Sequence, residues 1–431
     1  MLEHHRLLFD VLDKYVAESF ARAGTRSPRV CVIGRLGHGD HARAIALASA
    51  VRAEHPTAWT LLLMHTTAAG SMVEYDMAHH AQTIGVVNDY YNAQRLPRPL
   101  LVARLRKQFD VVFDCVPYAV GTYWNLDRQA RRGDPMYAEP NADDQLRADQ
   151  CLAPFRSLYD GYPFANACLR VREQFGGLNQ WEILAESSGL SVGADDLQCA
   201  IPMELAPWPT PEQLGMSVAA VQDGVFEFSP AEGLKSLKAH AGSADWSKTK
   251  FAGKQPYVVV GNSAGQGGSL KEAPVAVFKA IVAALKQKKV RCVQVGGPND
   301  PLIEGTVDRR GLRLPLSAKL VQDAIGVITI EGFLPYVAAG VGTPSMVLFG
   351  PTMMSTFMFE GNLNLVKTEP RVGGQLDVPC PYGSCFWMTG GWGEHCMADP
   401  EWTECVNFIT PMRAAASAQE FVSLCQGKPA A

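Results

Sequence analysis

The sequence contains no run of about 18 or more apolar residues, so it offers no candidate for a transmembrane helix. It also lacks a long run of Lys or Arg, and its formal net charge is −4, so we expect no nucleic-acid partner. Residues 1–26 have the pattern of an amphipathic helix and lack the apolar core of a signal peptide. We therefore expect a cytoplasmic protein whose 11 cysteines are thiols rather than a disulfide framework.

Two phosphate-site motifs are missing as well. No G-K-[ST] follows either glycine-rich turn, which excludes a Walker A loop. No Asp-x-Asp occurs anywhere in the chain, and that pair commonly holds a divalent ion on a diphosphate. We therefore expect no catalytic divalent metal.

The sequence does contain two similar halves. Its 431 residues, 47% of them hydrophobic, are too many for one core. From Pro28 onward, short apolar runs alternate with helical patterns, stop in a segment rich in Pro, Gly, Ser and Lys, and restart at Tyr257. This alternation predicts an α/β fold of two Rossmann-type domains facing across a cleft. The expected divisions are an N-terminal helix (1–27), an N-terminal Rossmann-like domain (28–206), a linker (207–254), a C-terminal Rossmann-like domain (255–370), a Cys-rich finger (371–410), and a C-terminal helix and tail (411–431).

The first glycine turn runs from Gly34 to Asp40. Its second part fits the dinucleotide pattern G-x-G-x-x-A, but the next strand ends in His65-Thr-Thr rather than in the acidic residue that pattern needs. Asp40 could also be a plain helix cap. Our functional hypothesis makes Asp40 a general base, because a carboxylate at the carboxyl end of the first strand can take a proton from an attacking hydroxyl.

The second glycine turn runs from Gly261 to Lys271, between a strand and a helix. Backbone N–H groups of such a loop bind anions. Lys271 is the nearest cation that could neutralise a departing diphosphate, assisted by Ser263 and the loop amides. The alternative is a solvent-facing lysine at the start of a helix.

The order of motifs resembles glycosyltransferase family 9, the ADP-heptose:lipopolysaccharide heptosyltransferases. The likeness runs from about Pro28 to Thr352 and is strongest in Val295-Gly-Gly-Pro-Asn-Asp300, Ala339-Gly-Val-Gly-Thr-Pro344 and Leu348-Phe-Gly-Pro-Thr352. Family members carry Asp-Thr-Gly and then His where this chain has Glu331-Gly-Phe and Pro335-Tyr336.

The resemblance implies a GT-B-like fold, an ADP-sugar donor and Asp40 in the place of the family's base. The residues it assigns to the nucleotide-sugar site, together with those of the second glycine turn, are Asn262, Ser263, Gly265, Gly296, Gly297, Glu331, Gly332, Gly350 and Thr352.

Four cysteines, Cys380, Cys385, Cys396 and Cys405, lie within 26 residues among several glycines. Clustered thiolates suit a structural zinc or iron ion, although the spacing is irregular and unconnected surface thiols are the alternative. With the Gly390-Gly-Trp-Gly393 run, the segment is similar to the iron-binding finger of bacterial autotransporter heptosyltransferases. That likeness implies a protein Ser hydroxyl as acceptor and a homo-oligomer.

Together these features predict an inverting, metal-independent glycosyltransferase. It would move a sugar, heptose by resemblance, from a nucleotide diphosphate to a hydroxyl of a protein or glycan. The alternatives are a dinucleotide-dependent oxidoreductase and a non-catalytic assembly protein with the same fold.

Overall fold

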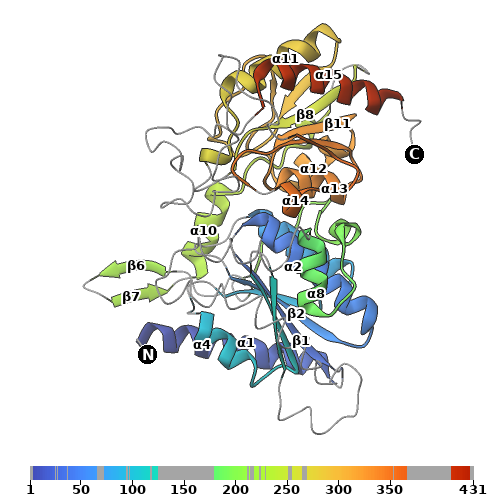
Figure 1. Ribbon diagram of the computed structural model, residues 1–431. Helices are drawn as coiled ribbons and strands as arrows, with labels where there is room; N and C mark the ends of the chain where they lie inside the picture. The colour runs from blue at the N-terminus through green and yellow to red at the C-terminus, as the bar shows by residue number, and fades with distance from the viewer. Residues whose placement is uncertain are drawn as a thin grey trace. The chain divides into compact units, whose positions relative to one another are not determined.

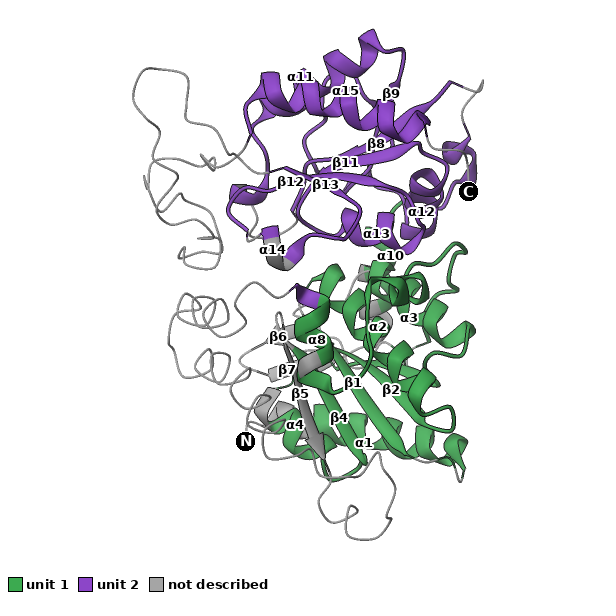
Figure 2. Cartoon of the chain, turned by 45° about the vertical axis from the view of Figure 1, so that its right-hand side comes forward, with its two compact units in different colours: residues 1–153, 181–242 green, residues 154–180, 243–431 purple. Residues whose placement is uncertain are grey.

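The computed structural model divides the chain into two compact units (Figure 2). Unit 1 comprises residues 1–153 and 181–242, and unit 2 comprises residues 154–180 and 243–431, so the chain leaves unit 1 and later returns to it. The structure describes residues 3–24, 26, 28–35, 37–65, 72–93, 96, 98–116, 119–124, 179–210, 213, 218–222, 225–228, 230–250, 255–264, 269–352, 354–365 and 409–427.

Unit 1 is built on a five-stranded sheet in the order β3-β2-β1-β4-β5. Its strands are β1 (Arg29–Arg35), β2 (Trp59–His65), β3 (Asp89–Asn92), β4 (Val111–Val116) and β5 (Ala119–Trp124). The first four pair in parallel, and β5 is antiparallel to β4. The near-continuous apolar runs of β1 and β2 are typical of strands covered on both faces.

Helices cover both faces of this sheet (Figure 1). On one face α1 (Glu3–Ala23) and α4 (Arg98–Leu105) pack on Cys31, Ile33 and Leu61. The other face carries α2 (His38–Glu54), which also contacts α3 (Met72–Thr83) and the short 3-10 helix η2 (Ala194–Cys199). The apolar residues of α1 that are buried in this layer include Leu8, Leu12, Tyr15 and Val16.

Helix α1 is fixed to the sheet by a buried polar contact. The Tyr15 hydroxyl donates to Asp89 Oδ1 at 2.6 Å and lies 2.7 Å from the Tyr90 carbonyl oxygen. Arg22 pairs with the same Asp89 carboxylate. Because burial beside this carboxylate disfavours the phenolate, the pKa of Tyr15 is well above its usual value.

The segment expected to be a linker contains regular structure. Its described parts include the hairpin of β6 (Val218–Gln222) and β7 (Val225–Phe228), then α10 (Pro230–His240) and the 3-10 helix η3 (Trp246–Thr249). Before it lies α8 (Gln180–Ser188). The division between the two units falls after Gly242.

Unit 2 holds a six-stranded sheet in the order β10-β9-β8-β11-β12-β13, parallel throughout. Its strands are β8 (Tyr257–Gly261), β9 (Arg291–Gln294), β10 (Val307–Asp308), β11 (Gly326–Ile330), β12 (Ser345–Leu348) and β13 (Leu363–Leu365). Its helical segments are η4 (Ser269–Lys271), α11 (Val275–Gln287), α12 (Leu314–Gln322), α13 (Leu334–Gly340), α14 (Met354–Phe357) and α15 (Pro411–Gly427).

One face of the unit 2 sheet is covered by α11 and α15, which lie side by side in both views (Figures 1 and 2). Phe278 of α11 and Phe421 of α15 enter the same buried cluster as Val258 and Ile328 of the sheet. Helices α12 and α13 lie on the other face. Both units are therefore layered α/β structures, with a mostly parallel sheet in unit 1 and a parallel sheet in unit 2, which confirms the expected α/β fold class. Within the described residues, no helix is long and apolar enough to span a bilayer.

The Tyr15 contact gives a stability prediction for unit 1. Tyr15→Phe removes the hydroxyl and leaves a buried carboxylate with one donor fewer, so the free energy of unfolding should fall by about 1–3 kcal/mol. Denaturant unfolding followed by circular dichroism measures it. The matched control is Lys14→Ala on the same helix, where the Lys14 side chain is 79% exposed; there the change should stay within about 0.5 kcal/mol. Equal losses in both variants would contradict this account of how α1 is held.

Candidate functional site

In each sheet, successive strands are added first on one side of a central strand and then on its other side. From β1 it proceeds outward to β2 and β3, and then returns to β4 on the other side. From β8 it proceeds to β9 and β10, and then returns to β11. Open α/β sheets bind ligands at the carboxyl ends of the strands at such a switch point. The residues that follow β1, β8 and β11 are therefore the candidates in the two units.

Lys271 and Glu331 meet at the switch point of unit 2. Glu331 directly follows β11, and Lys271 ends η4 in the loop that begins after β8. Lys271 Nζ lies 2.6 Å from Glu331 Oε2, and the two side chains are only 14% and 10% exposed. Lys271 thus lies on a short loop beside the strand ends, with one carboxylate against it. An incoming diphosphate could bind there by replacing Glu331 as the ionic partner of Lys271.

Asn262 closes the base of the same loop. Its Nδ2 donates to the Ala273 carbonyl at 2.9 Å, and its Oδ1 accepts from the Ala273 N–H at 2.8 Å. This two-way bond uses both ends of the amide, so Asn262 shapes the loop that carries Lys271. Ser263 is partly buried, and its carbonyl oxygen would lie 3.9 Å from a Cβ placed on Gly332. Gly265 lies outside the described residues.

Gly296 and Gly297 form a tight turn after β9. Gly296 has φ +144°, and a Cβ there would lie 2.3 Å from Asp300 Oδ2. The Gly297 N–H donates to the same Asp300 oxygen at 2.7 Å. A side chain at Gly296 would therefore collide with Asp300. The Gly297 N–H already has Asp300 as its hydrogen-bond acceptor.

Gly350 and Thr352 follow β12, the strand beside β11. Thr352 is 5% exposed, and its Oγ1 is buried with no hydrogen-bond partner among the described residues. A buried hydroxyl without a partner is costly unless water or a ligand satisfies it, so Thr352 keeps its place among the candidates.

In unit 1, Asp40 lies in the first turn of α2 and is engaged on both oxygens. Its Oδ2 accepts the Gly37 N–H at 3.1 Å, and its Oδ1 pairs with the buried guanidinium of Arg43. The helix-cap alternative is therefore realised in the structure. A carboxylate at this helix start also opposes the pyrophosphate of a dinucleotide, which disfavours the oxidoreductase interpretation.

The sequence did not point to three titratable neighbours of Asp40. Glu74, in the first turn of α3, is 6% exposed, with Oε1 4.0 Å from His38 Nε2 and 3.9 Å from His41 Nδ1. The His41 Nδ1 is also 3.0 Å from the Gly37 carbonyl oxygen, and its Nε2 is buried without a partner among the described residues. His38 stood inside the glycine turn and His41 directly after it, but Glu74 had no local signal because it comes from another helix.

Two further features of unit 2 were not expected. Burial raises the pKa of Glu272, the residue after Lys271. Tyr336, which stands near the position of the family's His, bonds through its hydroxyl to Gln180 Oε1 and packs edge-on against Phe359 with ring centroids 5.1 Å apart. Tyr336 is 6% exposed, so it acts as a core residue in this arrangement.

The cysteines of the expected finger, Cys380, Cys385, Cys396 and Cys405, lie outside the described residues. Within the part of the chain that is described, no three His, Cys, Asp or Glu side chains form a group that could hold a metal ion. The five described cysteines are free thiols, with Cys31, Cys115 and Cys292 buried in the core.

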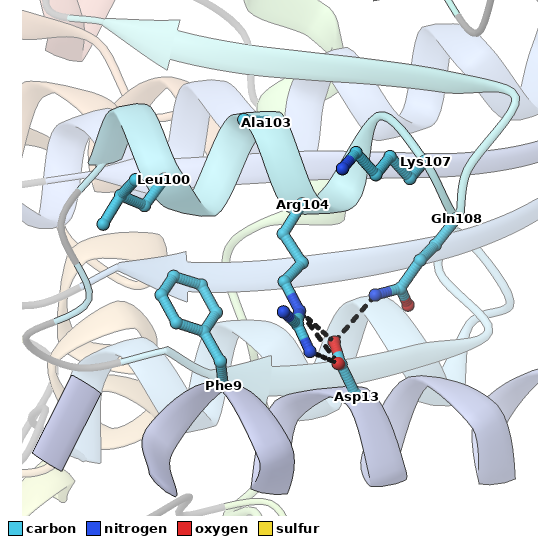
Figure 3. Close-up of a pocket in the computed structure, with 7 residues that line it drawn as sticks. All are labelled: Phe9, Asp13, Leu100, Ala103, Arg104, Lys107 and Gln108. Atoms are coloured by element: carbon cyan, nitrogen blue, oxygen red, sulfur yellow. Dashed lines mark hydrogen bonds and ion pairs between the residues drawn. The ribbon is translucent and has the colours of Figure 1, made fainter. Parts of the chain in front are cut away.

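Unit 1 also has a cavity of about 350 Å³, which none of these residues lines (Figure 3). It opens between α1 and α4, with Phe9, Leu100 and Ala103 on its apolar side. Arg104 and Gln108 both bond to Asp13 at its polar end. None of the candidates after β1, β8 or β11 lines it, so it belongs to the seam that attaches α1.

No protein-family model matches the chain, and no curated protein matches it. Among solved structures it is similar to the ADP-heptose lipopolysaccharide heptosyltransferase II of E. coli, with 14% identity, a TM-score of 0.46 and coverage of 93% of this chain and 100% of that one. It is also similar to a family 9 glycosyltransferase of Veillonella parvula (12%, 0.41, 78% and 85%).

A third similar structure is the dodecameric iron-containing heptosyltransferase TibC of enterotoxigenic E. coli, in complex with ADP-D-β-D-heptose. It has 10% identity and a TM-score of 0.44, with coverage of 93% of this chain and 76% of that one. All three TM-scores are below 0.5, so function has to be argued from this chain's own residues.

The Lys271–Glu331 pair gives a prediction for the ligand-free protein. Lys271→Met leaves the Glu331 carboxylate without its cation in a nearly buried place, and removing one member of a fully buried pair costs about 3–5 kcal/mol. We expect a loss of about 2 kcal/mol or more, largely recovered in Lys271→Met/Glu331→Gln, as measured by denaturant unfolding.

The matched control is the surface pair Lys279–Glu304, whose Nζ–Oε2 distance is 3.0 Å and whose side chains are 52% and 80% exposed. Lys279→Met should change stability by less than about 1 kcal/mol. If the double variant at 271 and 331 were no more stable than Lys271→Met, the two side chains would not be coupled.

Proposed function

We propose that the chain is a glycosyltransferase that moves a sugar from a nucleoside diphosphate to a hydroxyl group. The observation that carries the proposal is the nearly buried Lys271–Glu331 pair at the strand ends of unit 2. It places one cation, on a glycine-rich loop, where a parallel sheet binds phosphate groups. The resemblance to family 9 supports ADP as the nucleotide and heptose as the sugar.

In this reaction the acceptor oxygen attacks C1 of the sugar as the C1–O bond to the diphosphate breaks. The electron pair of that bond leaves with the diphosphate, and attack from the opposite face inverts C1. Lys271 leaves Glu331 to meet the charge on the departing group, assisted by loop amides. The chain has no Asp-x-Asp pair, and on that ground we propose transfer without a divalent ion at the diphosphate.

The remaining assignments are proposals of the same kind. Donor contacts come from Asn262, Ser263, Gly265, Gly296, Gly297, Glu331, Gly332, Gly350 and Thr352. Asp40 is the base that the sequence selects for the acceptor proton. The acceptor is a protein Ser hydroxyl or a glycan, and the enzyme is cytoplasmic and homo-oligomeric.

Nucleotide binding tests the proposal directly. ADP at about 100 times its dissociation constant should stabilise the protein by about 2.7 kcal/mol and raise the melting temperature, whereas UDP, GDP and NAD at the same concentration should raise it less. Lys271→Ala should weaken ADP binding by about 1–3 kcal/mol, the range for a charge-assisted contact.

Transfer of the sugar should persist when EDTA removes free divalent ions. A rise with NAD alone, or transfer that requires magnesium, would overturn the proposal.

We also propose one structural zinc or iron on Cys380, Cys385, Cys396 and Cys405, supported by four thiols within 26 residues. Elemental analysis of protein purified without a histidine tag should find about one such ion per chain. Cys385→Ser with Cys396→Ser should remove it, whereas the control Cys425→Ser, on α15, should not. A metal-free protein with four titratable thiols in that segment would contradict the proposal.

A further inference from the structure

The Lys271–Glu331 pair joins two neighbouring strand ends of unit 2. Strands β8 and β11 pair in parallel with Gly261 opposite Thr329, so the segments that carry the two side chains begin level with each other. These segments also stay close together, because the Ser263 carbonyl oxygen lies 3.9 Å from the position of a Cβ on the residue after Glu331. The backbone therefore brings the two charges together from adjacent strands.

Glu331 depends on Lys271 for the charge of its carboxylate. Its Oε2 is buried without a hydrogen-bond donor in favourable geometry among the described residues, and Lys271 Nζ lies 2.6 Å away. Glu272, the neighbour of Lys271 in the sequence, is engaged elsewhere, because it accepts a hydrogen bond from the Ala264 backbone. Glu331 is thus the carboxylate that an anion displaces when it binds Lys271.

Displacement of Glu331 has consequences for both side chains. Lys271 exchanges one negative partner for another, which costs little. Glu331 is left as a nearly buried carboxylate without a cation, which weakens binding unless the ligand itself brings a hydrogen-bond donor. A ligand with hydroxyl groups beside its phosphates satisfies both side chains. Sulfate has no hydroxyl group, so it satisfies Lys271 alone.

We propose that Glu331 makes this site selective for a nucleoside diphosphate over simple anions, a proposal that rests on the transferase function above. Selectivity is a difference between two affinities, and a penalty against the wrong ligand produces it as effectively as a better contact with the right one. Glu331 supplies the penalty, because every anion must displace it from Lys271. Hydroxyl groups of the bound nucleotide then donate to the freed carboxylate, so Glu331 becomes a contact of the donor.

The test measures the dissociation constants of sulfate and of ADP for the full chain, by calorimetric titration at fixed pH and ionic strength. Glu331→Gln preserves the size of the side chain and removes its charge, so sulfate should bind about tenfold tighter or more. ADP binding should change by less than about threefold, because the lost competition is offset by a weaker acceptor for the hydroxyl groups of the ligand. Each ligand is compared with itself, so the difference in size between sulfate and ADP cancels.

The matched control is Glu304→Gln, because Glu304 pairs with Lys279 at 3.0 Å but has a side chain that is 80% exposed. This change should leave both dissociation constants unaltered. Glu331→Asp is a second variant that retains the charge, so Lys271 keeps a counter-ion if the Gln variant does not fold. Its shorter side chain weakens the ion pair, so sulfate binding should tighten by a smaller factor.

The outcomes separate this inference from the transferase function. If the wild-type protein does not bind ADP, the transferase function fails, and the inference fails with it. If the wild type binds ADP but sulfate binds no tighter to the folded variants at 331, Glu331 does not compete for Lys271, and the inference alone is overturned. Equal gains for sulfate and ADP would show competition without selectivity, which also contradicts the inference.

Discussion

Each sheet has a central strand, β1 in unit 1 and β8 in unit 2. On one side of it lies the next strand in the sequence, β2 or β9, and on the other side lies a later strand, β4 or β11. Because crossovers between parallel strands are right-handed, the connections on the two sides leave the strand ends in opposite directions. That divergence keeps the carboxyl ends of β1 and β8 uncovered by crossovers. Three charged candidate residues lie at these strand ends: Asp40 after β1, Lys271 after β8 and Glu331 after β11.

The charged side chains at these strand ends are paired within their own units. Lys271 is neutralised by Glu331, and Asp40 is neutralised by Arg43. A ligand at either place must exchange one partner for another rather than meet a bare charge. Such an exchange costs little when the new partner carries the same charge as the old one, as a diphosphate does in place of a carboxylate. The charges thus favour an anion as a new partner of Lys271.

The sequence predicted the two α/β units well, because apolar runs alternating with helical patterns report burial directly. It also selected Lys271, since a glycine turn between a strand and a helix is a local signal. It could not predict the partner of Lys271: Glu331 stood out only as a departure from a family pattern. Glu74 was missed because it belongs to α3, and the packing of α3 against α2 produces no residue spacing that can be recognised in the sequence. Asn262 was selected as a ligand contact, whereas its amide closes the loop against Ala273.

The interrupted chain of unit 1 also affects how the protein is made. Unit 1 takes residues from both sides of 154–180, and its last part ends at residue 242. On a ribosome adding about 5–20 residues per second, the β1–β5 sheet therefore waits roughly 4–15 s for the α8 and η2 segments of its unit. During that interval the side of α2 that later contacts η2 lacks its cover. The nascent chain is therefore most open to aggregation or chaperone binding before the second half of the protein has been synthesised.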